Sequence, residues 1–163
     1  MVVEHRSRST APADGLPAGP SALGRTAAWL SKQLERALAE VDLSLPQYRI
    51  LGMLAEGASM PSALAERLAV RRPTVTAVVD GLAARGLVER SPADDDRRIV
   101  THTLTAKGKR LLAKADAAAD GRLVAIARSL DDAGSTARAL EGLELWRSAL
   151  RAHFVAQMSG NER

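Results

Sequence analysis

The apolar residues of this chain recur at helical spacing, and the longest such patterns lie toward its two ends. An early stripe repeats every three or four residues, the a/d pattern of a helix that packs against other helices. Its members are Leu23, Ala27, Leu30, Leu34, Ala37 and Val41. A late stripe over about residues 135–158 contains Leu140, Leu143, Trp146, Leu150 and Phe154. We therefore expect a first helix capped by Ser21 and a long last helix.

Prolines divide the region after the first stripe into three shorter helices. Pro46, Pro61 and Pro73 each stand where the first turn of a helix tolerates proline. Gly86 follows the third of these helices, at a position where glycine commonly ends a helix. The predicted helices cover about residues 45–57, 61–69 and 71–85.

A β-hairpin and another long helix are expected next. Residues 87–90 alternate apolar and polar side chains, and residues 99–104 are rich in β-branched ones. The polar segment 91–98 joins these two runs, which predicts a hairpin with a charged tip. Thr105 then caps a helix that runs to about residue 130.

This order of elements predicts a mainly α protein with a small β-hairpin wing, that is, a winged helix-turn-helix flanked by long helices. The flanking helices are too long for so small a module to cover, and a second copy of the chain is the simplest cover for their apolar faces. The expected organisation is a flexible N-terminal tail, a dimerisation helix, a winged helix-turn-helix lobe and C-terminal dimerisation helices, over residues 1–20, 21–44, 45–105 and 106–160.

Composition narrows the class of function. The chain has 163 residues and no cysteine, which excludes disulfides, thiolate metal sites and cysteine nucleophiles. It contains neither a phosphate-binding glycine loop nor a nucleophile motif. Its three histidines lack metal-ligand spacing. We therefore expect no enzyme activity, no metal and no cofactor. No apolar segment is long enough for a signal peptide or a membrane span, so we expect a cytoplasmic protein.

Several short segments then form one ordered pattern: Leu45–Arg49, Ala63–Leu68, Arg72–Thr76, Val79–Leu82, Gly86–Arg90, Asp96–Arg98 and Leu104–Gly108. Together they resemble the multiple antibiotic resistance regulator (MarR) family of bacterial transcription factors, over about residues 21–158. The resemblance implies a homodimer that binds a pseudopalindromic operator in double-stranded DNA, most simply as a repressor. It also implies a pocket for a small-molecule effector between the dimerisation region and the winged-helix lobe.

The sequence departs from the family pattern at three points. Arg71 stands where many relatives have an acidic residue, so an ion pair between wing and helix in those relatives is expected to be missing. Ala77 replaces a polar or basic residue, which removes one base contact. The absence of cysteine excludes the thiol sensing of some family branches.

The first turns of the third short helix are the predicted DNA-reading surface, because a helix fits the major groove and its start reaches the base edges. Arginine can contact guanine through two parallel hydrogen bonds, and threonine can contact phosphate or a thymine methyl group. The candidates are Arg71, Arg72, Pro73, Thr74 and Thr76.

The wing supplies a second set of candidates. Arg98 is expected in the minor groove and Arg97 on phosphate, while Asp96 orients an arginine or the turn. Arg85 and Arg90 are candidate phosphate contacts, for which an ordinary surface role is equally open.

The remaining candidates concern an effector and the dimer. Trp29, Tyr48 and Arg49 could line an effector pocket near the junction with the lobe, with ordinary packing as the alternative. The expected dimer interface contains Leu23, Leu30, Leu34, Leu143, Trp146, Leu150 and Phe154. A dimeric winged-helix module that binds another protein, without specific DNA binding, is the alternative function.

Overall fold

The computed structural model of the chain describes residues 22–57, 60–92 and 100–160. The predicted flexible tail (residues 1–20) and the wing-tip candidates Asp96, Arg97 and Arg98 lie outside the described residues. No helix of the described part is long and apolar enough to cross a membrane.

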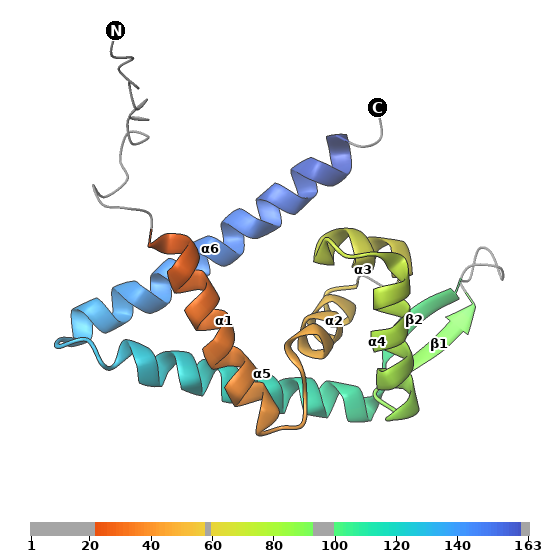
Figure 1. Cartoon of the computed structure of the whole chain (residues 1–163), viewed down its shortest axis with the longest axis horizontal. Coiled ribbons are helices and arrows are strands. Elements are labelled where there is room, and N and C mark those ends of the chain that lie inside the picture. The colour runs from red at the N-terminus through yellow and green to blue at the C-terminus, as the bar shows by residue number, and fades with distance from the viewer. Residues whose placement is uncertain (1–21, 58–59, 93–99, 161–163) are drawn as a thin grey trace, which may run out of the picture.

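Within the described residues, six helices and one hairpin follow in the predicted order, which confirms the expected fold class (Figure 1). The elements are α1 (Leu23–Ala39), α2 (Leu45–Ala55), α3 (Pro61–Leu68), α4 (Arg72–Ala84), β1 (Val88–Pro92), β2 (Val100–Leu104), α5 (Ala106–Ala127) and α6 (Ala133–Gly160). Proline stands in the first turn of α2, α3 and α4, as predicted. We refer to residues 45–105 as the winged-helix lobe.

Three predicted boundaries differ from the structure. The N-cap of α1 is Ala22, which has no side-chain acceptor, so Ser21 was wrongly expected to cap this helix. Helix α5 ends at Ala127 because the chain turns there toward α6. Strand β1 starts after Leu87, whose N–H donates to the Leu82 carbonyl at the end of α4 instead of joining the strand.

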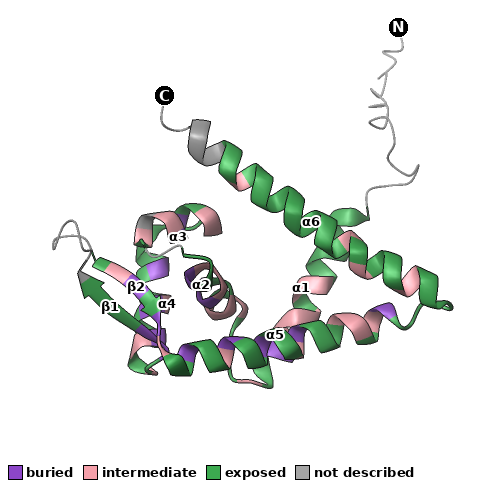
Figure 2. Cartoon of the chain, turned by 180° about the vertical axis from the view of Figure 1, so that it is seen from behind, coloured by how far each residue is buried: buried purple, intermediate pink, exposed green. Residues whose placement is uncertain are grey.

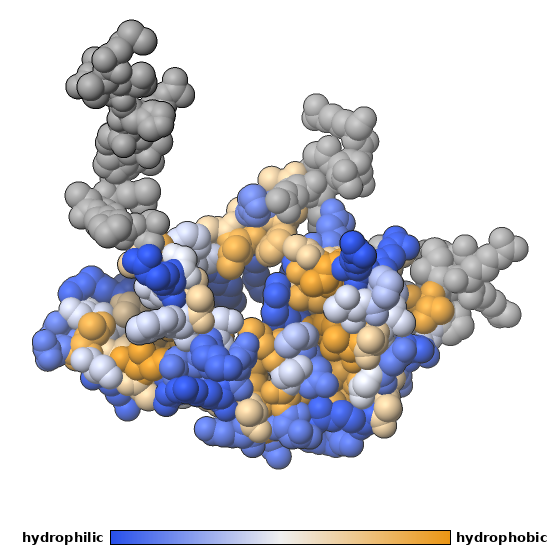
Figure 3. All heavy atoms as spheres, in the orientation of Figure 1, coloured by the Kyte–Doolittle hydropathy of each residue, from blue (hydrophilic) through white to orange (hydrophobic). Residues whose placement is uncertain are grey.

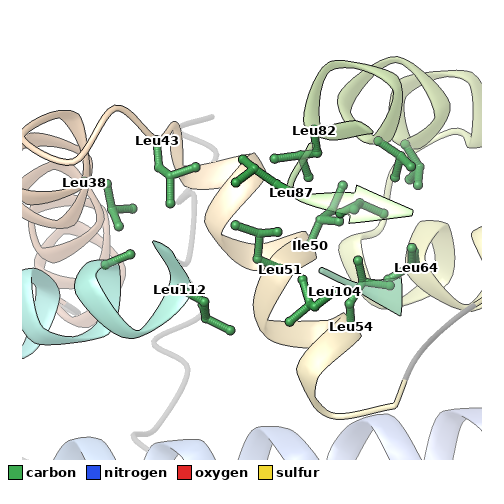
Figure 4. Close-up of a cluster of buried hydrophobic side chains, with 14 of the residues drawn as sticks. Leu38, Leu43, Ile50, Leu51, Leu54, Leu64, Leu82, Leu87, Leu104 and Leu112 are labelled. Carbon is green, nitrogen blue, oxygen red and sulfur yellow. The ribbon is translucent and has the colours of Figure 1, made fainter. Parts of the chain in front are cut away.

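The apolar core lies inside the winged-helix lobe and at its junction with α1 and α5 (Figure 4). Its fully buried side chains come from α1, α2, α3, α4 and the start of the hairpin, and include Leu38, Ile50, Leu51, Leu64, Leu82 and Leu87. Leu112 and Ala115 of α5 belong to the same cluster. One continuous core therefore joins the lobe to the middle of the molecule.

Helix α6 lies apart from that core. None of its residues from 133 to 156 is buried, and Figure 2 shows it exposed along most of its length. A helix is stabilised mainly by packing an apolar face. This chain alone provides little cover for α6.

A tight backbone junction connects α4, the hairpin and α5. The Thr105 N–H donates to the Leu87 carbonyl (3.1 Å), and the Thr105 hydroxyl donates to the Gly86 carbonyl (2.8 Å). The same hydroxyl accepts the Gly108 N–H (3.0 Å) and so caps α5. Gly108 packs directly on the Leu87 carbonyl, where a Cβ atom would overlap the oxygen. Glycine is therefore required at this position for α5 to start where it does.

We expect Gly108→Ala to lower the free energy of unfolding by at least about 1–3 kcal/mol, because the added methyl group forces α5 away from Leu87. Gly121→Ala is the matched control on the same helix, since its Cβ would meet open space. That variant should gain about 0.5–1 kcal/mol. Chemical denaturation followed by circular dichroism measures both, and an equal effect of the two changes would contradict the role of the junction.

Candidate nucleic-acid interface

Helix α4 is amphipathic, with one face in the core and the other in solvent. Val75, Val79 and Leu82 are buried against the rest of the winged-helix lobe. The opposite face is exposed and contains Arg72, Pro73, Thr76, Ala77 and Asp80. The apolar spacing within α4 thus presents the predicted DNA-reading residues to solvent together.

The start of α4 carries unneutralised positive charge. Arg71 and Arg72 are exposed, and neither guanidinium group forms a hydrogen bond or an ion pair with another residue in the part of the chain that the structure describes. No side chain caps the helix, and its first turn holds no acidic residue. The positive end of the helix dipole adds to the field of the two guanidinium groups. This surface is suited to phosphate or to base acceptors.

The two threonines of α4 are in different situations. The Thr76 hydroxyl donates to the Arg72 carbonyl one turn earlier (3.1 Å), so its hydrogen is used within the helix while its methyl group stays exposed. Thr74 is exposed, and no side-chain hydrogen bond involves it in the described residues. Both remain predicted DNA contacts, and Thr74 is the freer donor.

An ion pair joins the exposed face of α4 to the wing. The Arg90 guanidinium on β1 contacts the Asp80 carboxylate on α4. The sequence had suggested that a pair between helix and wing would be missing, since Arg71 replaces the usual acidic residue. The structure places such a pair at the far end of the helix instead. No sequence signal indicated this pair, because a carboxylate and an arginine ten residues apart read as ordinary solvated charges.

Arg85, the other candidate phosphate contact, is also paired within the chain. Its guanidinium donates to the Asp42 carboxylate (2.9 Å) and to the Asp42 carbonyl (2.8 Å), in the link between α1 and α2. Of the arginines in and beside α4, Arg71 and Arg72 are thus the ones left available.

The three effector-pocket candidates lie in separate surroundings. Trp29 is 77% exposed and lines a groove of about 520 Å³ between α1 and α5. Arg49 lines a smaller cavity of about 210 Å³ beside α4. Tyr48 is half-buried, and its hydroxyl donates to Asp116 of α5 (2.7 Å). The structure therefore does not gather these three side chains at one cavity.

The predicted dimer residues are largely uncovered. Leu23, Leu143, Trp146 and Leu150 are exposed, while Leu30, Leu34 and Phe154 are half-buried. Leu145 (71% exposed) and Val155 (65% exposed) extend the apolar surface of α6 beyond the predicted set. Figure 3 shows apolar side chains exposed along this helix. The late stripe missed Leu145 and Val155 because they lie on other faces of the helix.

Among the described residues, no group of three or more histidine, aspartate or glutamate side chains is placed to hold a metal ion. In this winged helix-turn-helix, α4 is the second helix of the helix-turn-helix, and it presents arginine side chains that are unpaired within the described residues. This arrangement defines a DNA-binding protein of the winged-helix class.

Comparison with known proteins identifies the family. The profile of the MarR family matches residues 41–99. The HTH-type transcriptional repressor Rv2887 of Mycobacterium tuberculosis is 34% identical over 117 residues, covering 69% of this chain and 84% of that protein. The chain belongs to the MarR family of transcriptional regulators, which bind DNA and are not enzymes.

Other comparisons are partial or concern the fold alone. A regulator of Mycobacterium bovis is 40% identical over 84 residues, but the chain spans 59% of its length. A mutant MarR from E. coli complexed with operator DNA is 24% identical, with a TM-score of 0.59 over 76% of this chain and 92% of that chain. CouR from Rhodococcus jostii RHA1, bound to p-coumaroyl-CoA, is 23% identical, with a TM-score of 0.64 over 81% and 88%.

The hydrogen bond of Tyr48 has a measurable consequence at high pH. Burial, and then the hydrogen bond to Asp116, raise the pKa of the Tyr48 phenol above its ordinary value of about 10. The unfolded chain releases this proton first, so the stability from Tyr48 is complete below pH 10 and falls as the pH rises above it.

Because the chain has a single tyrosine, its tyrosinate absorbance should titrate at higher pH in the native than in the denatured protein. Tyr48→Phe should also cost about 0.5–1.5 kcal/mol at neutral pH. Coincident native and denatured titrations would contradict this prediction.

Proposed function

We propose that the chain is a homodimeric repressor that binds a pseudopalindromic operator in double-stranded DNA. In the proposed complex, the two α4 helices lie in successive major grooves about 34 Å apart. The observation that carries this proposal is the exposed start of α4, where the guanidinium groups of Arg71 and Arg72 have no partner in the described residues. The sign of regulation is supported by the repressor Rv2887, which is 34% identical to this chain over 117 residues. Such a protein acts where the bacterial chromosome lies, in the cytoplasm.

The proposed DNA binding depends on where the arginines lie, and not on the total charge of the chain. The net charge of the chain is only +4, and several exposed arginines are neutralised internally. Arg85 and Arg90 each contact a carboxylate, so among the arginines in and beside α4 the guanidinium groups of Arg71 and Arg72 remain available to attract DNA. The predicted wing contacts Arg97 and Arg98, with Asp96 as the orienting residue, complete the proposed interface from the side of the minor groove.

A homodimer is proposed from the uncovered helices. The apolar residues Leu143, Trp146 and Leu150 of α6 are exposed in the isolated chain. Leu145 lies about 200° around the helix from Leu143, since each residue turns an α-helix by about 100°. A helix with apolar residues on more than one face is stable when other helices enclose it from several sides. A symmetric partner that packs its own α6 against this helix would provide that enclosure.

Release by a small-molecule effector extends the proposal. The groove between α1 and α5 combines Trp29 with Arg25 and Arg122, so it suits an aromatic anion. CouR, a protein of the same fold, is bound to p-coumaroyl-CoA in its crystal structure. An effector that favours another spacing of the two lobes lowers operator affinity by population shift.

Arg72→Ala should weaken operator binding by about 1–3 kcal/mol if the guanidinium contacts a base. The operator is obtained by selecting duplexes from a random pool with the wild-type protein, and affinity is measured by fluorescence anisotropy. Loss of a base contact relaxes specificity at one position, whereas loss of a phosphate contact lowers affinity for all sequences and reduces the salt slope by about one. Arg128→Ala, at the far end of α5, is the control and should bind normally.

Two outcomes of this titration bear on the proposal as a whole. If no sequence is selected and wild type and Arg72→Ala bind DNA equally, the operator proposal is wrong and the protein-binding alternative is favoured. The same titration, repeated with saturating phenolic anions, measures effector release.

Trp146→Glu should weaken the dimer, because it places a charge in an apolar interface. We expect the dimer dissociation constant to rise by at least about 30-fold, corresponding to roughly 2 kcal/mol for a central aromatic residue. Ala117→Glu, on the exposed face of α5, introduces the same charge as a control and should leave the dimer intact. Sedimentation velocity measures both, and a dimer that is unaffected by Trp146→Glu would exclude α6 from the interface.

A further inference from the structure

One carboxylate links three elements that are far apart in the sequence. Glu56, the C-cap residue of α2, accepts a hydrogen bond from Arg67 of α3 at Oε2 (2.9 Å). It accepts another from Arg151 of α6 at Oε1 (2.9 Å). Each oxygen therefore serves a different arginine. We call Glu56, Arg67 and Arg151 the Glu56 network.

The charges of the network are complementary and persistent. Partial burial opposes ionisation of Glu56, but the hydrogen bonds from Arg151 and Arg67 hold its pKa below the ordinary value. The carboxylate is thus ionised throughout the neutral range. Arg67 is the most enclosed member, with 22% of its side chain exposed, so the carboxylate is already oriented on the lobe side when Arg151 contacts it.

The network joins the winged-helix lobe to α6 on the side opposite its chain connections. The lobe is connected covalently to the other helices through residues 40–44 and through Thr105, and both connections lie on the side of α5 (Figures 1 and 2). Helix α3 lies on the opposite side of the lobe, toward α6. Rotation of the lobe about the line that joins these two connections is resisted by the core that the lobe shares with α1 and α5. A contact at Glu56, away from that line, restrains this rotation.

We propose that Glu56 and Arg151 are positioning residues, which fix the orientation of the winged-helix lobe relative to α6 and thereby the distance between the two recognition helices of the dimer. This inference rests on the proposed function, since it concerns two lobes that bind one operator. Neither residue belongs to the DNA-reading surface, because they lie at the end of α2 and on α6. Their effect on DNA binding passes through geometry.

The expected signature is a change in the tolerance for half-site spacing. A partly exposed ion pair contributes little to stability, so its loss should leave the melting temperature and the dimer almost unchanged. A lobe that rotates more freely, however, can follow half-sites that are moved apart. The wild-type protein should lose at least about tenfold in affinity when one base pair is inserted at the centre of the operator, which corresponds to about 1.4 kcal/mol.

The chain offers a closely matched control. Arg147 lies one turn before Arg151 on α6, and its side chain is similarly exposed (59% against 56%). Its partner is Glu144 of the same helix, with Nε to Oε2 at 2.8 Å. Arg147→Ala therefore removes the same charge from the same helix without breaking a contact to the lobe.

The experiment compares the wild type with Arg151→Ala, Glu56→Gln and Arg147→Ala on the selected operator and on its version lengthened by one base pair. We expect Arg151→Ala and Glu56→Gln to reduce the spacing penalty to less than about threefold, with Arg147→Ala keeping the wild-type penalty. Arg151→Lys, which keeps one charged donor, should restore part of the penalty. Affinity for a single half-site should be the same in all variants.

Several results would overturn this inference. Wild-type spacing penalties in both Arg151→Ala and Glu56→Gln would mean that the network does not position the lobe. Loss of the dimer in Arg151→Ala but not in Arg147→Ala would assign Arg151 to the dimer interface instead. A wild-type protein without sequence preference would refute the proposed function, and this inference with it. If the wild-type protein prefers its operator but the spacing penalties are unchanged in the variants, only this inference fails and the proposed function stands.

Discussion

The close approach of Gly108 to the Leu87 carbonyl is the constraint on which the rest of the structure depends. At this point the end of α4, the start of the hairpin and the start of α5 meet through backbone atoms. Thr105 completes the junction, because its hydroxyl contacts the Gly86 carbonyl and the Gly108 N–H together. Backbone contacts of this kind cannot adjust through rotamers. The position of α4 relative to the start of α5 is thus fixed at this junction by backbone atoms.

The electrostatic organisation follows a simple division. Arginines that face other elements are paired, as Arg67 is with Glu56, Arg85 with Asp42 and Arg90 with Asp80. These pairs stabilise the arrangement of the lobe and leave little excess charge on its sides. The start of α4 is different, because Arg71 and Arg72 face solvent next to the positive end of a helix dipole. A protein with a small net charge can still concentrate positive charge at one place.

The local elements could be predicted from the sequence because their signals are local. Prolines in the first turns of α2, α3 and α4, the Gly86 turn and the Thr105 cap each act within four residues. The long-range contacts gave no such signal. Asp80 and Arg90, or Glu56 and Arg151, read in sequence as ordinary solvated charges, and their pairing depends on tertiary packing. Trp29 and Tyr48 failed to share a cavity because Tyr48 turns toward Asp116 of α5, while Trp29 projects into solvent.

Helix α5 begins directly after the winged-helix lobe and ends beside the uncovered apolar surface, without a break over 22 residues. At about 1.5 Å per residue it is about 33 Å long, so a change of about 5° in its inclination at one end displaces the other by about 3 Å. That displacement is close to the separation of adjacent base pairs, about 3.4 Å. In the proposed dimer, a slight change in the angle at which two chains pack would therefore shift each α4 by nearly one base-pair step along the DNA.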